Sequence, residues 1–397
     1  MAICRTAVLS AAVLTALNGF SFAEVAESNV RFRGSLSNSR IQFENQKKGH
    51  VAFIGGSITE MNGYRPMVCE ILQRRFPETE FTFTAAGISS TCSTAGAFRL
   101  ERDVLSKGPV DLFFVEYAVN DDQDAGHARE NCIRGMEGII RQTRRHNPNA
   151  DIVITHFVNT GMIETIRGGG EPTSSGAHEE VAEHYGISTI HLAREVTQQI
   201  DSGKLTWQKF GGVHPAPFGN AICANMIDKL MSQAWKEPLH ADAKPAAHEL
   251  PAERLEEACY ENGRFIDPQK AKVASGFAWK TPNWKELPGS CRKRFVEEKL
   301  LCGEAGNELT LEFEGRGVGA FVLAGRDAGT VTASVDGGES VDIDLYHHYS
   351  RGLHYPRTVM LADDLPPGKH VLRLTVSDTA NPKSQGSAVR ILQFTAN

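Results

Sequence analysis

The strongest constraint on the fold is an alternation of apolar runs with helix-like patterns through the first half of the chain. The runs are Val51 to Ile54, Phe81 to Ala86, Asp111 to Ala118, Asp151 to Phe157 and Ile187 to Ala193. Strands that alternate with helices form a parallel sheet covered by helices on both faces. The uninterrupted run Leu112-Phe113-Phe114-Val115 predicts a central strand, whereas the alternating Phe81-Thr82-Phe83-Thr84 favours a place nearer an edge.

Three helices are predicted between and after these strands, at Tyr64 to Phe76, His127 to His146 and Phe218 to Trp235. The second helix has one apolar face, made by Cys132, Ile133, Met136, Ile139 and Ile140. It also carries Arg141, Arg144 and Arg145, which we expect to form a solvated helix end.

A glycine-rich segment from Gly161 to Ser175 contains Gly168-Gly169-Gly170 and predicts a flexible loop before a helix that begins near His178. The loop would lie on the carboxyl-end side of the sheet and would either cover or line a cleft there or form a surface insertion.

The composition changes between Glu237 and Glu253, where three prolines lie among alanines and charged residues. Beyond this segment, short β-type runs separated by turns predict a β-sandwich of jelly-roll type. The runs are Leu309 to Phe313, Val318 to Leu323, Val331 to Val335, Val341 to Leu345, Val371 to Val376 and Ile391 to Phe394. The expected domains are residues 24–240, a linker at 241–256 and the sandwich at 257–397.

The N-terminus has the order of a secretory signal: Arg5, an apolar core from Ala7 to Leu17, and the small-residue end Ser21-Phe22-Ala23. We expect residues 1–23 to be removed after Ala23 and the protein to be secreted or periplasmic. A membrane-spanning helix is the alternative, but the apolar run is too short to cross a bilayer. A net charge of −6 argues against nucleic acid and anionic membrane surfaces as partners.

Eight cysteines fall to seven once Cys4 leaves with the signal, which permits at most three internal disulfides. Cys291 and Cys302 could close a hairpin, whereas Cys69, Cys132 and Cys223 lie in helical patterns typical of buried thiols. No pair has the spacing of a zinc site. The loop from Tyr346 to Tyr355 carries aromatic rings and histidines, but their irregular spacing favours an interface or surface loop over a metal or sugar site. We predict no metal and no cofactor.

The stretch Gly55-Gly56-Ser57-Ile58-Thr59 follows the first strand and reads as strand, tight turn and helix. A serine at such a turn projects from the carboxyl end of a buried strand, where backbone N–H groups stabilise negative charge. The alternative is a simple chain reversal in which Ser57 is an N-cap. Gly87, Asn120 and His214 each lie near a strand end or before a helix and favour the catalytic interpretation.

With Ser57, Gly87, Asn120 and His214 in this order, the chain resembles the SGNH (GDSL-like) hydrolase superfamily over about residues 48 to 235. The resemblance implies a flavodoxin-like α/β/α fold and esterase chemistry. It also implies that Ser57 is the nucleophile, His214 the general base, and the N–H groups of Ser57 and Gly87 with the Asn120 amide the oxyanion hole.

Two positions depart from the family pattern. Gly56 replaces the Asp of the name-giving block, and Gly211 stands three residues before His214, where the family usually has the triad acid. A Ser-His dyad is the favoured hypothesis; the alternatives are a backbone carbonyl, water, or one of Glu60, Glu116, Asp121 and Asp122. An aspartate installed at position 211 would test the dyad if the loop tolerates the side chain.

The resemblance, export and the attached sandwich together predict a serine esterase that removes O-acetyl groups from carbohydrate through an acyl-enzyme. The substrate is then a small ester or an acetylated carbohydrate. A general carboxylesterase or lysophospholipase of the same fold is the alternative. A catalytically impaired carbohydrate-binding module is a third reading, which retention of Ser57, Asn120 and His214 disfavours.

Overall fold

A computed structural model describes residues 26–397, so the predicted signal at residues 1–23 lies outside the described part of the chain. The chain forms two compact units. The first comprises the residues up to Gly87 with Val110–Gln123 and Asn149–Ala247, and the second comprises Ile88–Pro109, Asp124–Pro148 and His248–Asn397.

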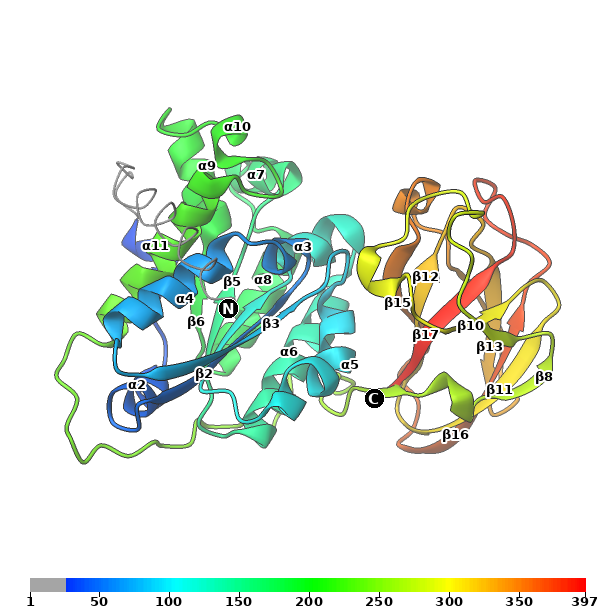
Figure 1. The fold of residues 1–397 in the computed structure, drawn as a ribbon, viewed down its shortest axis with the longest axis horizontal. Helices are drawn as coiled ribbons and strands as arrows, with labels where there is room; N and C mark the ends of the chain where they lie inside the picture. The colour runs from blue at the N-terminus through cyan, green and yellow to red at the C-terminus, as the bar shows by residue number, and fades with distance from the viewer. Residues whose placement is uncertain (1–25) are drawn as a thin grey trace, which may run out of the picture. The chain divides into compact units, whose positions relative to one another are not determined.

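A six-stranded sheet with the order β1-β6-β5-β4-β2-β3 forms the centre of the first unit (Figure 1). Its strands are β1 Val30–Arg31, β2 Lys48–Gly55, β3 Glu80–Gly87, β4 Leu112–Glu116, β5 Asp151–Thr155 and β6 Ser188–Ile190. Strands β2 to β6 are parallel, and β1 adds antiparallel to β6. Counted along the chain, the parallel strands have the spatial order 2-1-3-4-5, which is the flavodoxin-like order.

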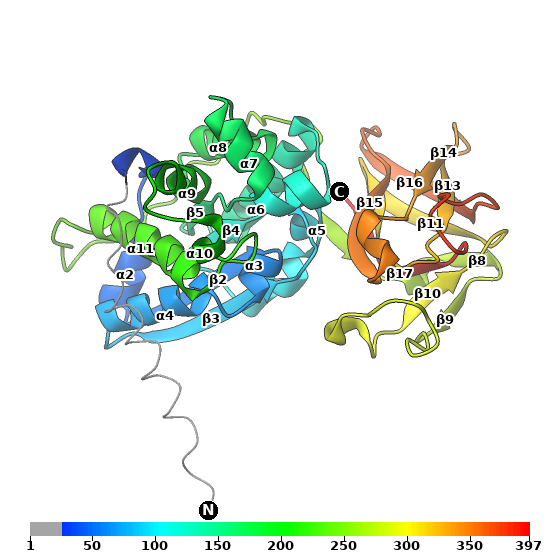
Figure 2. The same ribbon diagram turned by 90° about the horizontal axis from the view of Figure 1, so that it is seen from above.

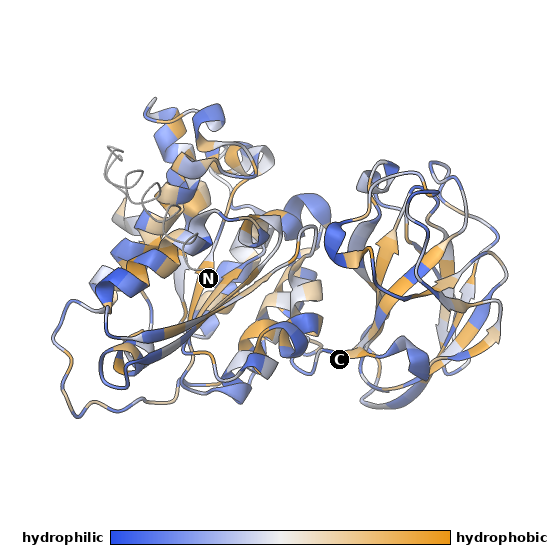
Figure 3. Cartoon of the chain, viewed as in Figure 1, coloured by the Kyte–Doolittle hydropathy of each residue, from blue (hydrophilic) through white to orange (hydrophobic). Residues whose placement is uncertain are grey.

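This arrangement confirms the predicted α/β fold class and each predicted strand. β4 is central and fully buried, and β3 lies at the edge, as the continuous and alternating patterns indicate. The last run is shorter than expected because β6 ends at Ile190 and helix α9 begins at Leu192. In Figure 3 the hydrophobic colour follows the strands, where side chains of β2 and β4 are buried on both faces.

Helices of the first unit pack their apolar residues against this sheet, and α4 and α11 lie side by side (Figures 1 and 2). The predicted helices at 64–76 and 218–235 are confirmed as α4 and α11. The helical elements here are η1 Glu27–Asn29, α2 Ser37–Glu44, α3 Ser57–Glu60, α4 Tyr64–Arg75, η3 Asn120–Asp124, α7 Thr160–Arg167, α8 Thr173–His184, α9 Leu192–Asp201, α10 Trp207–Phe210 and α11 Pro217–Ala234.

The prediction of a flexible loop from Gly161 to Ser175 is wrong. Helix α7 occupies Thr160–Arg167, and its N-terminus is capped by the Asn159 side chain, which accepts a hydrogen bond from the Met162 N–H at 2.9 Å. Helix α8 begins at Thr173, so the glycine triplet only separates two helices. An N-cap asparagine and the buried Met162 and Ile163 outweigh the local glycine signal.

Two antiparallel sheets form the β-sandwich of the second unit and confirm its predicted class. One has the order β15-β12-β17-β10-β9 with β7 beside β17, and the other has the order β14-β13-β16-β11-β8. A single apolar cluster joins residues of both sheets. The strands are β7 Arg264–Ile266, β8 Lys272–Ser275, β9 Ala278–Lys280, β10 Leu300–Gly303, β11 Glu308–Gly315, β12 Val318–Ala324, β13 Thr330–Val335, β14 Val341–Asp344, β15 Tyr355–Ala362, β16 Gly368–Val376 and β17 Val389–Ala396.

The six predicted sandwich strands are present as β11 to β14, β16 and β17, while the sequence interpretation missed β7 to β10 and β15. The second unit also contains α5 Ser93–Asp103, η2 Leu105–Lys107, α6 Arg129–His146, η4 Pro268–Lys270, η5 Lys293–Phe295 and η6 His348–Arg351. Helix α6 confirms the helix predicted at 127–146.

The expected solvated arginine end of α6 is wrong for Arg141 and Arg144, which are each only 4% exposed. Glu261 accepts hydrogen bonds from Arg254 at 2.6 and 2.9 Å and also pairs with Arg141 and Arg145. Arg144 donates to the Glu249 carbonyl at 2.7 Å. Carboxylate and carbonyl acceptors from beyond residue 248 therefore compensate the burial of these cations.

All seven cysteines within residues 26–397 are free thiols, including Cys291 and Cys302, which do not close a disulfide. Cys132 and Cys223 are buried as expected, and Cys69 is half-buried. Among the helices in the described part of the chain, none combines the length and the apolar character needed to span a bilayer.

Glu261 gives a testable stability prediction. Burial alone would raise the pKa of Glu261, but hydrogen bonds from Arg254, Arg141 and Arg145 outweigh burial and lower the pKa from 4.5 to about 2. Because the carboxyl pKa is depressed in the folded state, its stabilising contribution is present above about pH 4.5 and is lost as the pH falls towards 2. Glu261→Gln should cost about 3 kcal/mol at pH 7, since it leaves buried arginines without their anion.

Chemical denaturation at several pH values measures this effect. The loss caused by Glu261→Gln should shrink between pH 4.5 and pH 2. An equal loss at pH 7 and pH 2 would contradict the ion-pair explanation. Glu312→Gln is the control, because Glu312 pairs only with the exposed Lys272.

Candidate active site

Ser57 is the first residue of the short helix α3, directly after the turn that follows β2. Gly55 is the last residue of β2, and Gly56 precedes α3 with φ −84° and ψ −144°. The Ser57 side chain is half-buried, whereas Ile58 and Thr59 point into the protein and are fully buried or nearly so. The strand-turn-helix geometry expected at this serine is therefore present.

Strand register brings the next two predicted residues to the same edge of the sheet. Gly55 of β2 pairs with Gly87 of β3 on one side and with Glu116 of β4 on the other. Asn120 begins the π-helical turn η3, four residues after Glu116, and is 2% exposed. Because β2 and β4 flank the point where strand order reverses, these residues lie where open α/β sheets bind ligands.

Close packing explains the glycines at this edge. A β-carbon on Gly56 would lie 1.9 Å from Oδ1 of Asn120, so the Asn120 side chain lies directly against the Gly56 backbone. A β-carbon on Gly87 would lie 2.2 Å from the backbone nitrogen of Glu60 in α3. The aspartate that the family usually has at position 56 cannot fit beside Asn120 in this arrangement.

His214 meets Ser57 across a separation of 157 residues. Its Nε2 lies 2.7 Å from Oγ of Ser57, and the imidazole is exposed. Nε2 can accept the hydroxyl proton at this distance. Within residues 26–397 this is the one hydrogen bond or ion pair of the His214 side chain, so no described carboxylate is bonded to its Nδ1.

The loop that carries His214 is closed at both ends. The Ala216 N–H donates to the Phe210 carbonyl at 2.8 Å, and Nδ2 of Asn220 donates to the carbonyls of Pro215 and Ala216 at 2.6 and 3.1 Å. Asn220 belongs to α11 and is 1% exposed. The buried Asn220 amide therefore anchors the loop at Pro215, the residue after His214.

Gly211 ends α10 in the left-handed region, with φ +106°. A β-carbon there would lie 1.9 Å from the Ala216 backbone nitrogen. The loop therefore does not tolerate a side chain at position 211, and Gly211→Asp would disrupt the loop instead of restoring an acid.

All four alternative acids have other interactions in the described chain, Glu60 included. Glu116 is buried beneath the turn and accepts a hydrogen bond from Thr59 Oγ1 at 3.1 Å. Asp121 lies 2.9 Å from Nε2 of His178, and Asp122 accepts from Nδ2 of Asn159 at 2.7 Å. With no acid of the described chain bonded to His214, the geometry is that of a Ser-His pair.

Residues that the sequence interpretation missed form a second polar cluster near the ends of β5 and β6. His156, Glu179 and His191 place one ligand atom each within 4.8 Å of one another, and all three are buried. Burial lowers the pKa of His156 to about 4. Glu179 also pairs with Arg31 and Arg33, so two cations already compensate the carboxylate, which disfavours a divalent metal. The histidines follow strand ends, but their partner on α8 gave no signal in the sequence.

The Ser57–His214 contact at the carboxyl end of a flavodoxin-like sheet is the geometry that a serine-nucleophile hydrolase requires. Residues 53–222 match the model of the GDSL-like Lipase/Acylhydrolase family. The matched segment is thus a GDSL-like acylhydrolase domain, the kind of domain found in serine ester hydrolases.

A two-domain esterase of known structure shares the fold of both units. This esterase (CEX) is active on acetylated mannans and was solved alone and with mannopentaose. Its sequence is 19% identical to this one, and the superposition has a TM-score of 0.73 and covers 94% of this chain and 98% of the esterase chain. A shorter protein, the acetylxylan esterase Axe2 from Geobacillus stearothermophilus, is 19% identical with a TM-score of 0.37, covering 46% of this chain and 94% of its own. No curated protein matches the sequence.

The contact between Gly56 and Asn120 gives a direct test of the site. Gly56→Ala places a methyl group where Oδ1 of Asn120 lies and must displace that side chain. If Asn120 is an oxyanion donor, kcat for p-nitrophenyl acetate should fall on the order of 100-fold, the cost of one such donor.

The matched control is Gly352→Ala, because a β-carbon on Gly352 has nothing within 4 Å. Its kcat should equal that of the wild type. Circular dichroism would verify that both variants are folded, and an unchanged kcat in folded Gly56→Ala would remove Asn120 from the oxyanion hole.

Proposed function

We propose that this protein is an exported carbohydrate esterase that removes O-acetyl groups through a Ser57 acyl-enzyme. The observation that carries the proposal is the 2.7 Å contact between Ser57 Oγ and His214 Nε2 at the carboxyl end of β2. Asn120, which packs against Gly56, and Gly87, which packs against α3, supply candidate oxyanion-hole donors at the same edge of the sheet.

Acylation begins when Ser57 Oγ attacks the ester carbonyl and His214 Nε2 takes the hydroxyl proton. The carbonyl oxygen becomes an oxyanion, held by the N–H groups of Ser57 and Gly87 and by the Asn120 amide. Collapse of this intermediate breaks the bond to the alcohol, which leaves with the proton from His214. Water then attacks the acyl-enzyme under the same base and releases acetate and free Ser57.

The pair works without a carboxylate on Nδ1 of His214. In a protease triad, loss of the correct histidine tautomer costs about 10⁴ in kcat, so orientation has to come from elsewhere. The closed 210–216 loop and the Asn220 hydrogen bonds supply backbone rigidity. Acetyl esters need less activation than amides, which suits a dyad.

The substrate class is supported by the two-domain relative, whose name states activity on acetylated mannans and which shares both units of the fold. Export is supported by the order of charged, apolar and small residues in residues 1–23. The proposed domain limits are residues 24–240 for the hydrolase, 241–256 for the linker and 257–397 for the sandwich.

Ser57→Ala should abolish release of acetate from acetylated polysaccharides and from p-nitrophenyl acetate, because the nucleophile is lost and no core volume changes. Ser106→Ala, at an exposed serine of η2, is the control and should retain full activity. Normal turnover by Ser57→Ala would exclude the proposed nucleophile, and an inactive wild-type enzyme on every ester would favour a binding module.

Asn120→Asp keeps the shape of the side chain but replaces its N–H donor with an acceptor. We expect kcat to fall on the order of 100- to 1000-fold. KM for p-nitrophenyl acetate should change little. Steady-state kinetics separate the two constants, and a change confined to KM would make Asn120 a substrate contact instead.

A further inference from the structure

A cavity of 410 Å³ lies within the second unit. Its lining comes from residues 90–94, residues 124–134, Tyr260, and the segment from Ile343 to Asp363 that contains strand β15. The volume falls in the range of small-molecule sites, roughly 300 to 1,000 Å³.

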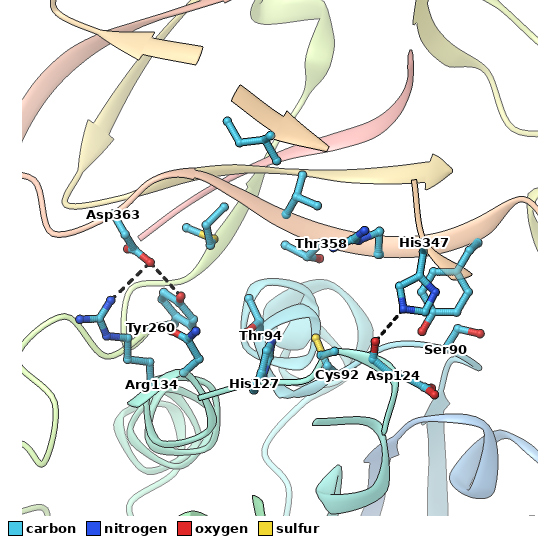
Figure 4. Close-up of a pocket in the computed structure, with 17 residues that line it drawn as sticks. Ser90, Cys92, Thr94, Asp124, His127, Arg134, Tyr260, His347, Thr358 and Asp363 are labelled. Carbon is cyan, nitrogen blue, oxygen red and sulfur yellow. Dashed lines mark hydrogen bonds and ion pairs between the residues drawn. The ribbon is translucent and has the colours of Figure 1, made fainter. Parts of the chain in front are cut away.

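Figure 4 shows how polar side chains line this cavity. Thr94, Cys92 and His127 lie on one wall, and Thr358 of β15 and Asp363, which follows β15, lie on the facing wall. His347 closes one end and donates from Nε2 to the Asp124 carbonyl at 2.7 Å. Strand β15 is the edge strand of its sheet.

Arg357 of β15 is the unusual group in the lining. Only its Nη1 makes hydrogen bonds, to the carbonyls of Leu345 and Tyr346, each at 3.4 Å. No carboxylate among residues 26–397 forms an ion pair with it. Burial lowers the pKa of Arg357. A partly buried guanidinium without an anion is costly, and a carboxylate matches its planar fork.

Two other arginines of this unit have carboxylate partners. Arg134, at the far end of the cavity, pairs with Asp364 at 2.9 Å and Asp363 at 3.5 Å. Asp363 in turn accepts from the Tyr260 hydroxyl at 3.0 Å. Arg390 forms two hydrogen bonds with Asp327. Arg357 differs from these two arginines because no carboxylate of the described chain forms an ion pair with it.

Neutral polar groups in the cavity lining indicate that a ligand should also carry hydroxyl groups. The Thr94 hydroxyl and the Asn131 side-chain amide have no hydrogen-bond partner in the described chain and suit hydroxyl groups. The His347 and Tyr355 rings stack with centroids 4.2 Å apart and provide a flat face for ring carbons. Asp124 also lines the cavity, so a ligand carboxylate has one favourable position, at Arg357.

We propose that this cavity binds a hexuronate residue, with its carboxylate on Arg357 and its hydroxyls towards Thr94 and Asn131. The inference deepens the proposed function and rests on it, since it makes a polysaccharide that carries hexuronate the preferred substrate. Binding itself does not depend on ester hydrolysis.

Isothermal titration of the full chain with methyl glucuronoside, methyl glucoside and acetate tests the site without any ester. Methyl glucuronoside should bind saturably and at least roughly 10-fold more tightly than either of the others. Equal binding of methyl glucoside would overturn the role of the carboxylate. Displacement of methyl glucuronoside by equimolar acetate would overturn the role of the sugar ring. Absence of saturable binding would overturn the site and leave the Ser57 proposal intact.

Arg357→Met should weaken glucuronoside binding about 10- to 100-fold, because hydrogen bonds to a charged group are lost. Arg357→Lys, which keeps charge without the fork, should be intermediate. Arg351→Met is the matched control on the exposed part of η6 and should bind as the wild type. If Arg357→Met does not fold, Asn131→Ala should weaken binding in its place. Wild-type affinity in a folded Arg357→Met or in Asn131→Ala would overturn the assignment.

Discussion

The parallel hydrogen-bond ladder between β2 and its two neighbours sets the positions of Ser57, Gly87 and Asn120 in the candidate active site. It aligns Gly55, Gly87 and Glu116 at one level of the sheet, so the turns after three strands open at the same edge. Ser57 and Asn120 follow two of these strands, and Gly87 ends the third. A shift of register by one residue would turn each of these side chains to the other face. The chemistry thus depends on burial of β2 and β4, whose apolar side chains specify the register.

Much of this could be predicted from the sequence because it depends on local periodicity. The continuous Leu112-Phe113-Phe114-Val115 placed β4 at the centre, and the alternating Phe81-Thr82-Phe83-Thr84 placed β3 at the edge. Prediction failed where one local signal masked another. Three glycines at 168–170 suggested a long loop, although Asn159 caps a helix before them. Strands β8 and β9 lack apolar alternation because their residues are exposed.

Pairings between distant residues could not be predicted from sequence at all. Arg141 and Glu261 are 120 residues apart, and Ser57 and His214 are 157 apart. A charge on a helix face ordinarily indicates solvent, yet Arg141 and Arg144 are buried because acceptors beyond residue 248 reach them. The Ser57 and His214 pairing was anticipated only through family resemblance, which carries tertiary information that composition and spacing lack.

The glycines at 56 and 211 have a shared physical explanation that the sequence did not reveal. Each replaces an acid of the family pattern, and each stands where a β-carbon would lie 1.9 Å from another atom. At position 56 the Asn120 side chain occupies that space, so glycine lets the proposed oxyanion donor approach the turn. At position 211 it belongs to the backbone of Ala216, whose hydrogen bond to Phe210 closes the loop that carries His214. A tighter loop held by Asn220 can restrict the imidazole through the backbone, whereas a carboxylate restricts it through Nδ1. The absence of an acid at 211 is therefore a consequence of how this loop is closed.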